Sequence, residues 1–213
     1  MGTPRYIAVE GPIGVGKTSL ARSLAAEFSA RCVLENANEN PFLRRFYQDR
    51  RKYGFQTQIF FLLSRYHQQQ ELQQLDLFSQ VTISDYLFAK DRIFASVNLD
   101  ETEMALYERV YRLLTGRIPT PDLVIYLQAN AQVLLSRIWQ RDQEYERSID
   151  AEYLQTLVEA YHNYFFHYSE NPLLIIDTSE IDFVHREQDL AILVKEIQRP
   201  RSGTWYYVPQ SSQ

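Results

Sequence analysis

A glycine-rich stretch near the N-terminus constrains the fold of this chain more than any other feature. Residues 11–18 read GPIGVGKT, which fits the phosphate-loop pattern G-x-x-x-x-G-K-[ST]. The apolar run Tyr6–Glu10 precedes the stretch, and a helical pattern over Lys17–Phe28 follows it. This order predicts a phosphate-binding loop, because backbone N–H groups and the helix N-terminus attract anionic oxygens at such a turn.

We expect this loop to bind a nucleoside triphosphate together with Mg²⁺. Lys17 would contact the β- and γ-phosphates, and the hydroxyl of Thr18 would be a ligand of the metal ion. The residues expected to bind the triphosphate are Gly11, Gly14, Gly16, Lys17, Thr18 and Ser19. The loop therefore predicts the ligand, but it does not predict the acceptor of the phosphoryl group.

Short apolar runs alternate with amphipathic patterns along the chain, which predicts an α/β fold with a five-stranded parallel sheet flanked by helices. The predicted strands are Tyr6–Glu10, Cys32–Glu35, Val81–Asp85, Leu123–Leu127 and Leu173–Ile176. The predicted helices are Lys17–Phe28, Phe55–Leu75, Glu101–Leu114, Ala131–Arg141 and one that begins near Asp150. We expect residues 1–200 to form one domain and residues 201–213 to form a surface tail.

Composition argues against several classes of protein. The net charge of −5 argues against a broad nucleic-acid-binding surface. No apolar run is long enough to span a bilayer, and the N-terminus lacks a signal-peptide pattern, so we expect a cytoplasmic protein without a membrane partner. The single cysteine, Cys32, excludes an internal disulfide framework and a cysteine-based metal site.

Three kinds of phosphoryl acceptor are compatible with the loop: water, another nucleotide, and a hydroxyl group of a small molecule. In an open α/β sheet, the residues that decide between them lie at the carboxyl ends of the strands. Glu35 ends the second predicted strand. A carboxylate there could accept the proton of an attacking alcohol, although an exposed strand-end carboxylate without a catalytic role is the alternative.

The sequence resembles the deoxynucleoside kinase family, most closely its bacterial deoxyadenosine/deoxyguanosine kinase branch. The resemblance is carried by EGPIGVGKTS, ENPFLRRFYQD, FQTQIFFLLSRY, ISDYLFAKDRIFA, RIWQRDQEYERSIDAEYL and DTSEIDF. It implies a P-loop kinase fold with an arginine-containing lid. It also implies a nucleotide-salvage enzyme that uses Mg²⁺ and transfers phosphate from ATP to the 5′-hydroxyl of a deoxynucleoside. The expected substrate is a purine deoxynucleoside, deoxyadenosine or deoxyguanosine.

The resemblance implies roles in binding the acceptor. Glu35 matches the general base for the 5′-hydroxyl, and Gln56 matches the amide that reads the nucleobase edge. Tyr47 and Glu146 match the pair that holds the sugar 3′-hydroxyl. Further candidates for contact with the base, each with a core or structural alternative, are Phe55, Phe88, Arg65 and Asp91.

The stretch Arg137–Arg147 corresponds to the lid. Arg137 and Arg141 are four residues apart and share a helix face, so they could neutralise charge on the transferred phosphoryl group. A solvated helix with scattered arginines is the alternative. Downstream, the loop Asp177–Phe183 corresponds to the loop that contacts the adenine of the donor, with Asp182 and Phe183 as the candidate residues.

The sequence departs from the family pattern at the third predicted strand. Many members carry an acidic residue followed by arginine and serine there, whereas this chain reads Ser84-Asp85-Tyr86. Asp85 can still serve the Mg²⁺ sphere. Lys90 or Arg92 could supply the missing positive charge near Glu35, and the sequence does not decide between them.

Two other functions compete with a deoxynucleoside kinase. A nucleoside monophosphate kinase, such as a thymidylate kinase, would need extra arginines near Glu35, and the candidates are Arg44, Arg45, Arg50 and Arg51. A nucleotide-binding regulatory module would need a second switch motif, which the sequence lacks. We also expect a homodimer, because the helices Phe55–Leu75 and Glu101–Leu114 carry apolar residues on more than one face, and the family usually pairs them.

Overall fold

The computed structural model describes residues 4–75, 81–116, 118–141, 143–199 and 202–209. The strands in this part of the chain are β1 (Tyr6–Glu10), β2 (Arg31–Val33), β3 (Thr82–Ser84), β4 (Leu123–Gln128), β5 (Leu173–Asp177) and β6 (Thr204–Tyr207). They form one parallel sheet in the order β2-β3-β1-β4-β5-β6. The predicted α/β class is confirmed, and each of the five predicted strands lies within two residues of an observed one.

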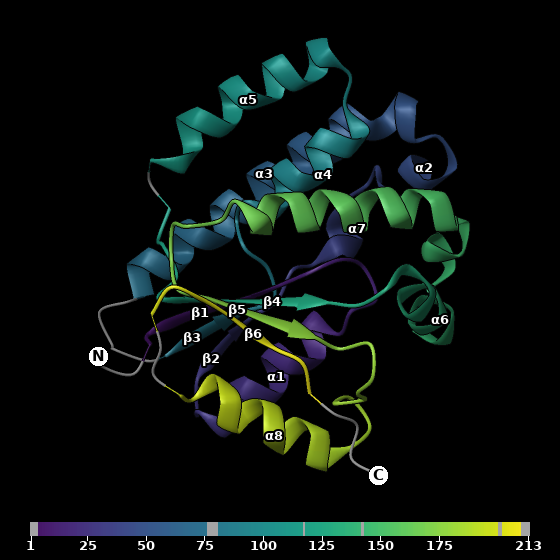
Figure 1. The fold of residues 1–213 in the computed structure, drawn as a ribbon. Coiled ribbons are helices and arrows are strands. Elements are labelled where there is room, and N and C mark those ends of the chain that lie inside the picture. Colours follow the sequence, from purple (N-terminus) through teal and green to yellow (C-terminus); the bar gives the residue numbers. More distant parts are fainter. Residues whose placement is uncertain (1–3, 76–80, 117, 142, 200–201, 210–213) are drawn as a thin grey trace.

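Helices cover both faces of this sheet (Figure 1). They are α1 (Lys17–Glu27), α2 (Leu43–Gln48), α3 (Arg50–Leu75), α4 (Lys90–Asn98), α5 (Glu101–Thr115), α6 (Ala131–Arg141), α7 (Ala151–Phe166) and α8 (Glu187–Ile197). Helices α1 and α8 lie on one face, whereas α3, α4, α5 and α7 lie on the other. No helix in the described ranges is both long enough and apolar enough to cross a membrane.

The central strand β1 explains how the two faces are filled. All its residues are buried, and successive side chains point to opposite faces. Ile7 and Val9 pack into the core with α1, whereas Tyr6 and Ala8 pack into the cluster that contains residues of α7. Because β1 lies between β3 and β4, the chain leaves its carboxyl end at the point where the strand order reverses, which is where open α/β sheets bind ligands.

The sixth strand corrects our prediction of a C-terminal tail. Strand β6 lies inside the segment 201–213 and pairs in parallel with β5. Trp205 and Tyr207 pack against the core, and Thr204 and Tyr206 are exposed, which is the alternation of an edge strand. The prediction was wrong for this segment because four residues are too few to establish a period of two.

The unpredicted helix α4 shows how buried polar residues hide a helical pattern. Lys90 and Asp91 are buried on this helix alongside Ile93 and Ala95. Polar residues therefore occupy part of the face that would otherwise show the apolar periodicity of a helix. The two buried charges point instead to the site described below.

Candidate active site

The phosphate loop is closely packed from two sides. Gly11 and Gly16 have φ values of 153° and 100°, which side chains rarely adopt. A Cβ at Gly16 would lie 2.7 Å from Cζ of Phe183, and one at Gly11 would lie 2.3 Å from the carbonyl oxygen of Leu127. Gly11 and Gly16 are therefore required by close contacts with β4 and with the loop that follows β5.

Lys17 holds its ammonium group over the phosphate loop. Its Nζ donates hydrogen bonds to the carbonyl oxygens of Gly11 and Pro12, at 2.7 and 2.9 Å. Burial lowers the pKa of Lys17 to about 8, and the positive charge of Lys90 adds to this effect. The ammonium group thus makes contacts with backbone carbonyls that a triphosphate oxygen could replace.

Asp85 joins the phosphate loop to Glu35, the predicted general base. Its Oδ2 accepts a hydrogen bond from Oγ1 of Thr18 at 2.5 Å, and its Oδ1 accepts one from the backbone N–H of Glu35 at 2.7 Å. The two predicted Mg²⁺ residues are therefore adjacent. Their hydroxyl and carboxylate oxygens suit Mg²⁺, which is usually held by one or two protein groups plus phosphates and water.

Glu35 is held by two cations. Its Oε1 accepts hydrogen bonds from Nε of Arg65 at 2.8 Å and from Nη2 of the same residue. Its Oε2 accepts one from Nζ of Lys90 at 2.5 Å. Lys90 therefore supplies the positive charge that the sequence left open, whereas Arg92 pairs with Glu108 on the outside of the site.

These ion pairs set the pKa of Glu35. Burial alone would raise it, but the charges and hydrogen bonds of Arg65 and Lys90 outweigh burial and lower the pKa to about 2. The carboxylate is therefore ionised throughout the physiological range.

This low pKa predicts a pH-dependent stability difference between the wild type and Glu35→Gln. A carboxyl group whose pKa falls from 4.5 to about 2 on folding stabilises the protein above pH 4.5, and that contribution is lost as the pH falls toward 2. Near neutral pH, the free energy of unfolding of the wild type should be larger than that of the variant by about 3 kcal/mol. The gap should narrow by about 1 kcal/mol at pH 3.5. Urea unfolding of both proteins between pH 6 and 3.5 measures it, and a gap independent of pH would contradict the assignment.

Arg65 also contacts Asp91. The Nη1 of Arg65 donates to Oδ1 of Asp91, and the hydroxyl of Tyr107 donates to Oδ2 at 2.8 Å. Burial raises the pKa of Asp91 to about 6, against the opposing effects of Arg65 and Tyr107. The predicted Arg65–Asp91 pair is thus present, with a tyrosine that the sequence reading did not identify.

Gln58, not Gln56, lies on the buried face of α3 that carries Arg65. Gln56 is exposed, whereas Gln58 is 2 % exposed and its Oε1 has no hydrogen-bond partner among the described residues. Helix geometry explains the difference: seven residues from Gln58 to Arg65 return to about the same face, whereas nine residues from Gln56 reach the opposite face. Counting from Arg65 in the sequence could have found Gln58.

The two phenylalanines proposed for base stacking lie in the core. Phe88 is 6 % exposed, and its ring stacks on Tyr111 with a centroid distance of 5.4 Å. Phe55 is partly buried and packs against the cluster that contains Phe88. The core alternative therefore describes both residues in this structure. By contrast, the half-buried ring of Phe61 lies beneath the guanidinium of Arg65, at 4.9 Å.

The two residues predicted to hold the sugar lie on neighbouring elements. Tyr47 of α2 stacks on Tyr145, with ring centroids 6.0 Å apart. Glu146, in the 3-10 helix Glu144–Ser148, is buried and forms an ion pair with Arg141. Burial raises the pKa of Tyr47 well above its usual value, and its hydroxyl stays protonated. The structure thus brings the two groups to one region, which also includes Arg141, one of the two arginines predicted for the lid.

The other arginine predicted for the lid, Arg137, holds the loop after β5. Its guanidinium donates to Oγ1 and the carbonyl oxygen of Thr178, at 3.1 and 2.8 Å, and to the carbonyl oxygen of Ile181 at 3.0 Å. The carboxylate of Asp182 accepts hydrogen bonds from the N–H groups of Val184 and His185 in its own loop. In this structure these predicted donor-site residues stabilise the loop, and their contact with a donor remains a prediction.

Glu10 is a further buried group that the sequence reading missed. It is fully buried, and it accepts hydrogen bonds from the N–H of Gly11 at 2.8 Å, the N–H of Leu87 at 2.7 Å and the hydroxyl of Tyr161 at 3.0 Å. Burial raises its pKa. Glu10 thus ties the phosphate loop to the segment between β3 and α4, which leads to Lys90.

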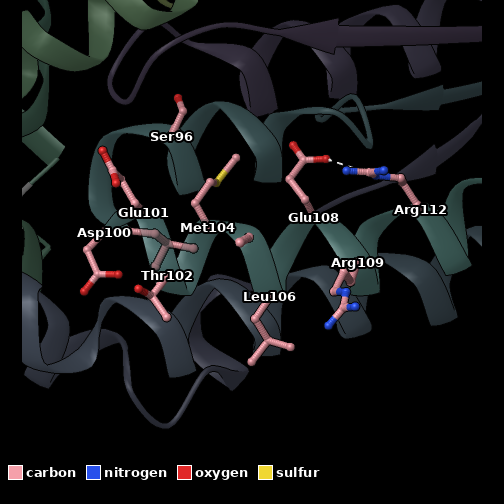
Figure 2. Close-up of a pocket in the computed structure, with 11 residues that line it drawn as sticks. Ser96, Asp100, Glu101, Thr102, Met104, Leu106, Glu108, Arg109 and Arg112 are labelled. Atoms are coloured by element: carbon pink, nitrogen blue, oxygen red, sulfur yellow. Dashed lines mark ion pairs between the residues drawn. The ribbon is translucent and has the colours of Figure 1, made fainter.

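A groove of about 910 Å³ lies apart from these residues, where α4 meets α5 (Figure 2). Its lining includes Met104, Leu106 and the ion-paired Glu108. None of the predicted site residues lines it. The phosphate loop, Glu35 and Asp85 follow the carboxyl ends of β1, β2 and β3, away from this groove.

Comparison with known proteins gives a consistent family. The sequence profile of the deoxynucleoside kinase family matches residues 7–200. A deoxyguanosine kinase of Bacillus subtilis (strain 168) is 36% identical over 205 residues, which cover 92% of this chain and 99% of the relative. A deoxyadenosine kinase of Dictyostelium discoideum is 35% identical, over 89% of this chain and 78% of the relative.

Solved structures agree with the fold. A deoxyadenosine kinase from M. mycoides with bound dATP superposes with a TM-score of 0.78 and 25% identity, over 92% of this chain and 100% of that protein. The same enzyme with bound dCTP gives a TM-score of 0.78 and 26% identity, over 90% of this chain and 98% of that one. The likeness therefore extends over nearly the whole chain in both sequence and structure.

Proposed function

The chain belongs to the deoxynucleoside kinase family, and we propose that it transfers the γ-phosphoryl group of ATP to the 5′-hydroxyl of a purine deoxynucleoside. One observation carries the proposal: Asp85 contacts both Thr18 of the phosphate loop and the backbone of Glu35. A carboxylate that could take the proton of an alcohol is therefore fixed beside the donor loop. The reaction depends on ATP and Mg²⁺, and we propose that it occurs in the cytoplasm, as a step of nucleotide salvage.

The charged residues around the phosphate loop and Glu35 have defined tasks in this reaction. Lys17 and the loop amides bind the β- and γ-phosphates, and Thr18 and Asp85 would hold Mg²⁺. Bound Mg²⁺ neutralises phosphate charge. Glu35 accepts the hydrogen bond of the 5′-hydroxyl and orients it. Lys90 donates to Oε2 of Glu35, and this oxygen has a second acceptor position for the 5′-hydroxyl. The charge of Lys90 is therefore placed to stabilise the transferred phosphoryl group.

Gln58 and Arg65 are the groups we propose for reading the base. The amide of Gln58 offers a donor and an acceptor, and its Oε1 is unpartnered among the described residues. Three of the five N–H donors of Arg65 bind Glu35 and Asp91, which leaves two. Arginine donors match the O6 and N7 acceptors of guanine, so we propose deoxyguanosine as a better substrate than deoxyadenosine.

Gln58→Leu is expected to lower kcat/KM for purine deoxynucleosides by about 100-fold, because a buried base edge loses a matched hydrogen-bonding amide. The matched control is Gln56→Leu, two residues earlier on the exposed face of α3. Steady-state kinetics with varied nucleoside and saturating ATP compares the two. Equal losses in both variants would contradict the assignment of Gln58.

A substrate panel tests the proposed specificity. Deoxyguanosine, deoxyadenosine, deoxycytidine, thymidine and the corresponding monophosphates are each offered with ATP and Mg²⁺. We expect the purine deoxynucleosides to give the highest kcat/KM. A preference for the monophosphates would support the thymidylate kinase alternative. The structure offers that alternative little support, because Arg44, Arg45 and Arg51 have exposed side chains and Arg50 pairs with Asp150.

We also propose a homodimer, formed through α3 and α5. Leu106 and Leu113 of α5 are 50% and 80% exposed, and they are seven residues apart on one helix face. Leu63 of α3 is 41% exposed. Burying these leucines against a second copy would remove apolar surface from water. Sedimentation at micromolar concentration should give a dimer, and Leu113→Asp should shift it toward monomer; a wild-type monomer would contradict the proposal.

A further inference from the structure

A chain of hydrogen bonds runs from helix α5 to Glu35, the proposed general base. Tyr107 of α5 is fully buried, and its hydroxyl donates to Oδ2 of Asp91 on α4 at 2.8 Å. The other oxygen of Asp91 accepts from Nη1 of Arg65 on α3, and Nε and Nη2 of Arg65 donate to Oε1 of Glu35. Four residues from separate elements are thus joined in one series, and the reaction described above gives no task to the first of them.

The geometry of Arg65 lets this chain transmit orientation. Its guanidinium is planar and rigid, so the direction of Nη1 toward Asp91 also fixes the directions of Nε and Nη2 toward Glu35. A carboxylate has about four acceptor positions. Arg65 takes two of them and Lys90 takes a third, so one position on Oε2 stays open to the 5′-hydroxyl. Where Arg65 is held decides where that open position points.

We propose that Tyr107 and Asp91 are positioning residues that orient Glu35 through Arg65, and that this series links the nucleobase pocket to the reacting hydroxyl. The inference rests on the proposed role of Glu35 and deepens it. A nucleobase that binds Arg65 also affects the orientation of the Glu35 carboxylate. The identity of the nucleobase therefore affects kcat and not only KM. Tyr107, outside the pocket, is a determinant of turnover.

Tyr107→Phe removes one oxygen atom and keeps the buried ring. The matched control is Tyr111→Phe, four residues later on the same helix, where the hydroxyl makes no hydrogen bond to a described residue. With saturating ATP and Mg²⁺ and a purine deoxynucleoside, we expect Tyr107→Phe to lower kcat by about tenfold, with KM changed less than about threefold, because a misplaced catalytic group slows the chemical step. Tyr111→Phe should stay within about twofold of the wild type.

Double variants separate positioning from a general loss of structure. In a Glu35→Gln background, Tyr107→Phe should cost no further activity, because the group that it positions is already absent. Asp91→Asn tests the next link of the series, and it serves as the second variant if Tyr107→Phe fails to fold. The kcat of the double variant Asp91→Asn/Tyr107→Phe should be higher than the product of the two separate fold-losses predicts.

The outcomes are distinguishable from failure of the proposed function. Equal kcat values for Tyr107→Phe and Tyr111→Phe, or full multiplication of the Tyr107→Phe and Glu35→Gln losses, would overturn the inference while the wild type still phosphorylated nucleosides. A wild type without activity on any nucleoside would overturn the proposed function itself.

Discussion

Lys17→Ala is expected to reduce phosphoryl transfer by about 10³-fold or more. The ammonium group lies within the phosphate loop and is the cation that follows its last glycine. Removing a positioned charge that binds the transferred phosphoryl group forfeits interactions that strengthen in the transition state. The loss should appear in kcat with saturating ATP, measured by coupled assay of ADP formation.

The fold should survive this change. Lys17 is half-buried, and it donates to backbone carbonyls of its own loop and not to a distant element. Lys195→Ala, at an exposed position of α8, is the matched control and should behave as the wild type. Wild-type turnover by Lys17→Ala, with an unchanged melting temperature, would remove Lys17 from the mechanism.

Glu35→Gln is expected to lower kcat by about 10²-fold, with nucleoside affinity changed far less. Glutamine keeps the shape of the side chain but cannot accept a proton. It also places an amide N–H group among the donors of Arg65 and Lys90, which already occupy both carboxylate oxygens. The kcat loss, with thermal unfolding as the control for folding, measures this effect.

Glu35→Asp separates proton removal from positioning. Aspartate keeps a carboxylate but withdraws it by one methylene group. The low pKa of Glu35, about 2, makes it a weak base in the absence of substrate, and a dissociative transition state needs little proton removal early in the reaction. A loss in Glu35→Asp nearly as large as in Glu35→Gln would therefore assign Glu35 a positional role. A Glu35→Gln variant with full kcat would exclude any catalytic role.

The parts of the site that the sequence predicted are those fixed by local spacing. The loop from Gly11 to Thr18 is contiguous, so its geometry follows from its pattern. Glu35 and Asp85 follow the neighbouring strands β2 and β3, and parallel strands bring their carboxyl ends together. The contact between these two residues follows from the order of the sheet.

The remaining site residues depend on rotation about helix axes and on tertiary packing. The choice between Lys90 and Arg92 needed the direction of α4, whereas Gln58 could have been found from its spacing to Arg65 on α3. Tyr107 lies on a helix that carries no predicted site residue. Its role follows only from the contact with Asp91, which no spacing in the sequence specifies.

The chemical identity of the product tests the account most directly. The wild-type enzyme is incubated with ATP, Mg²⁺ and deoxyguanosine, and ³¹P NMR follows the phosphorus species. We predict one deoxyguanosine 5′-monophosphate for each ADP formed, and no reaction with 5′-deoxy analogues that lack the accepting hydroxyl. Formation of ADP and inorganic phosphate without any deoxynucleoside 5′-monophosphate, with deoxyguanosine or any other deoxynucleoside, would contradict the account.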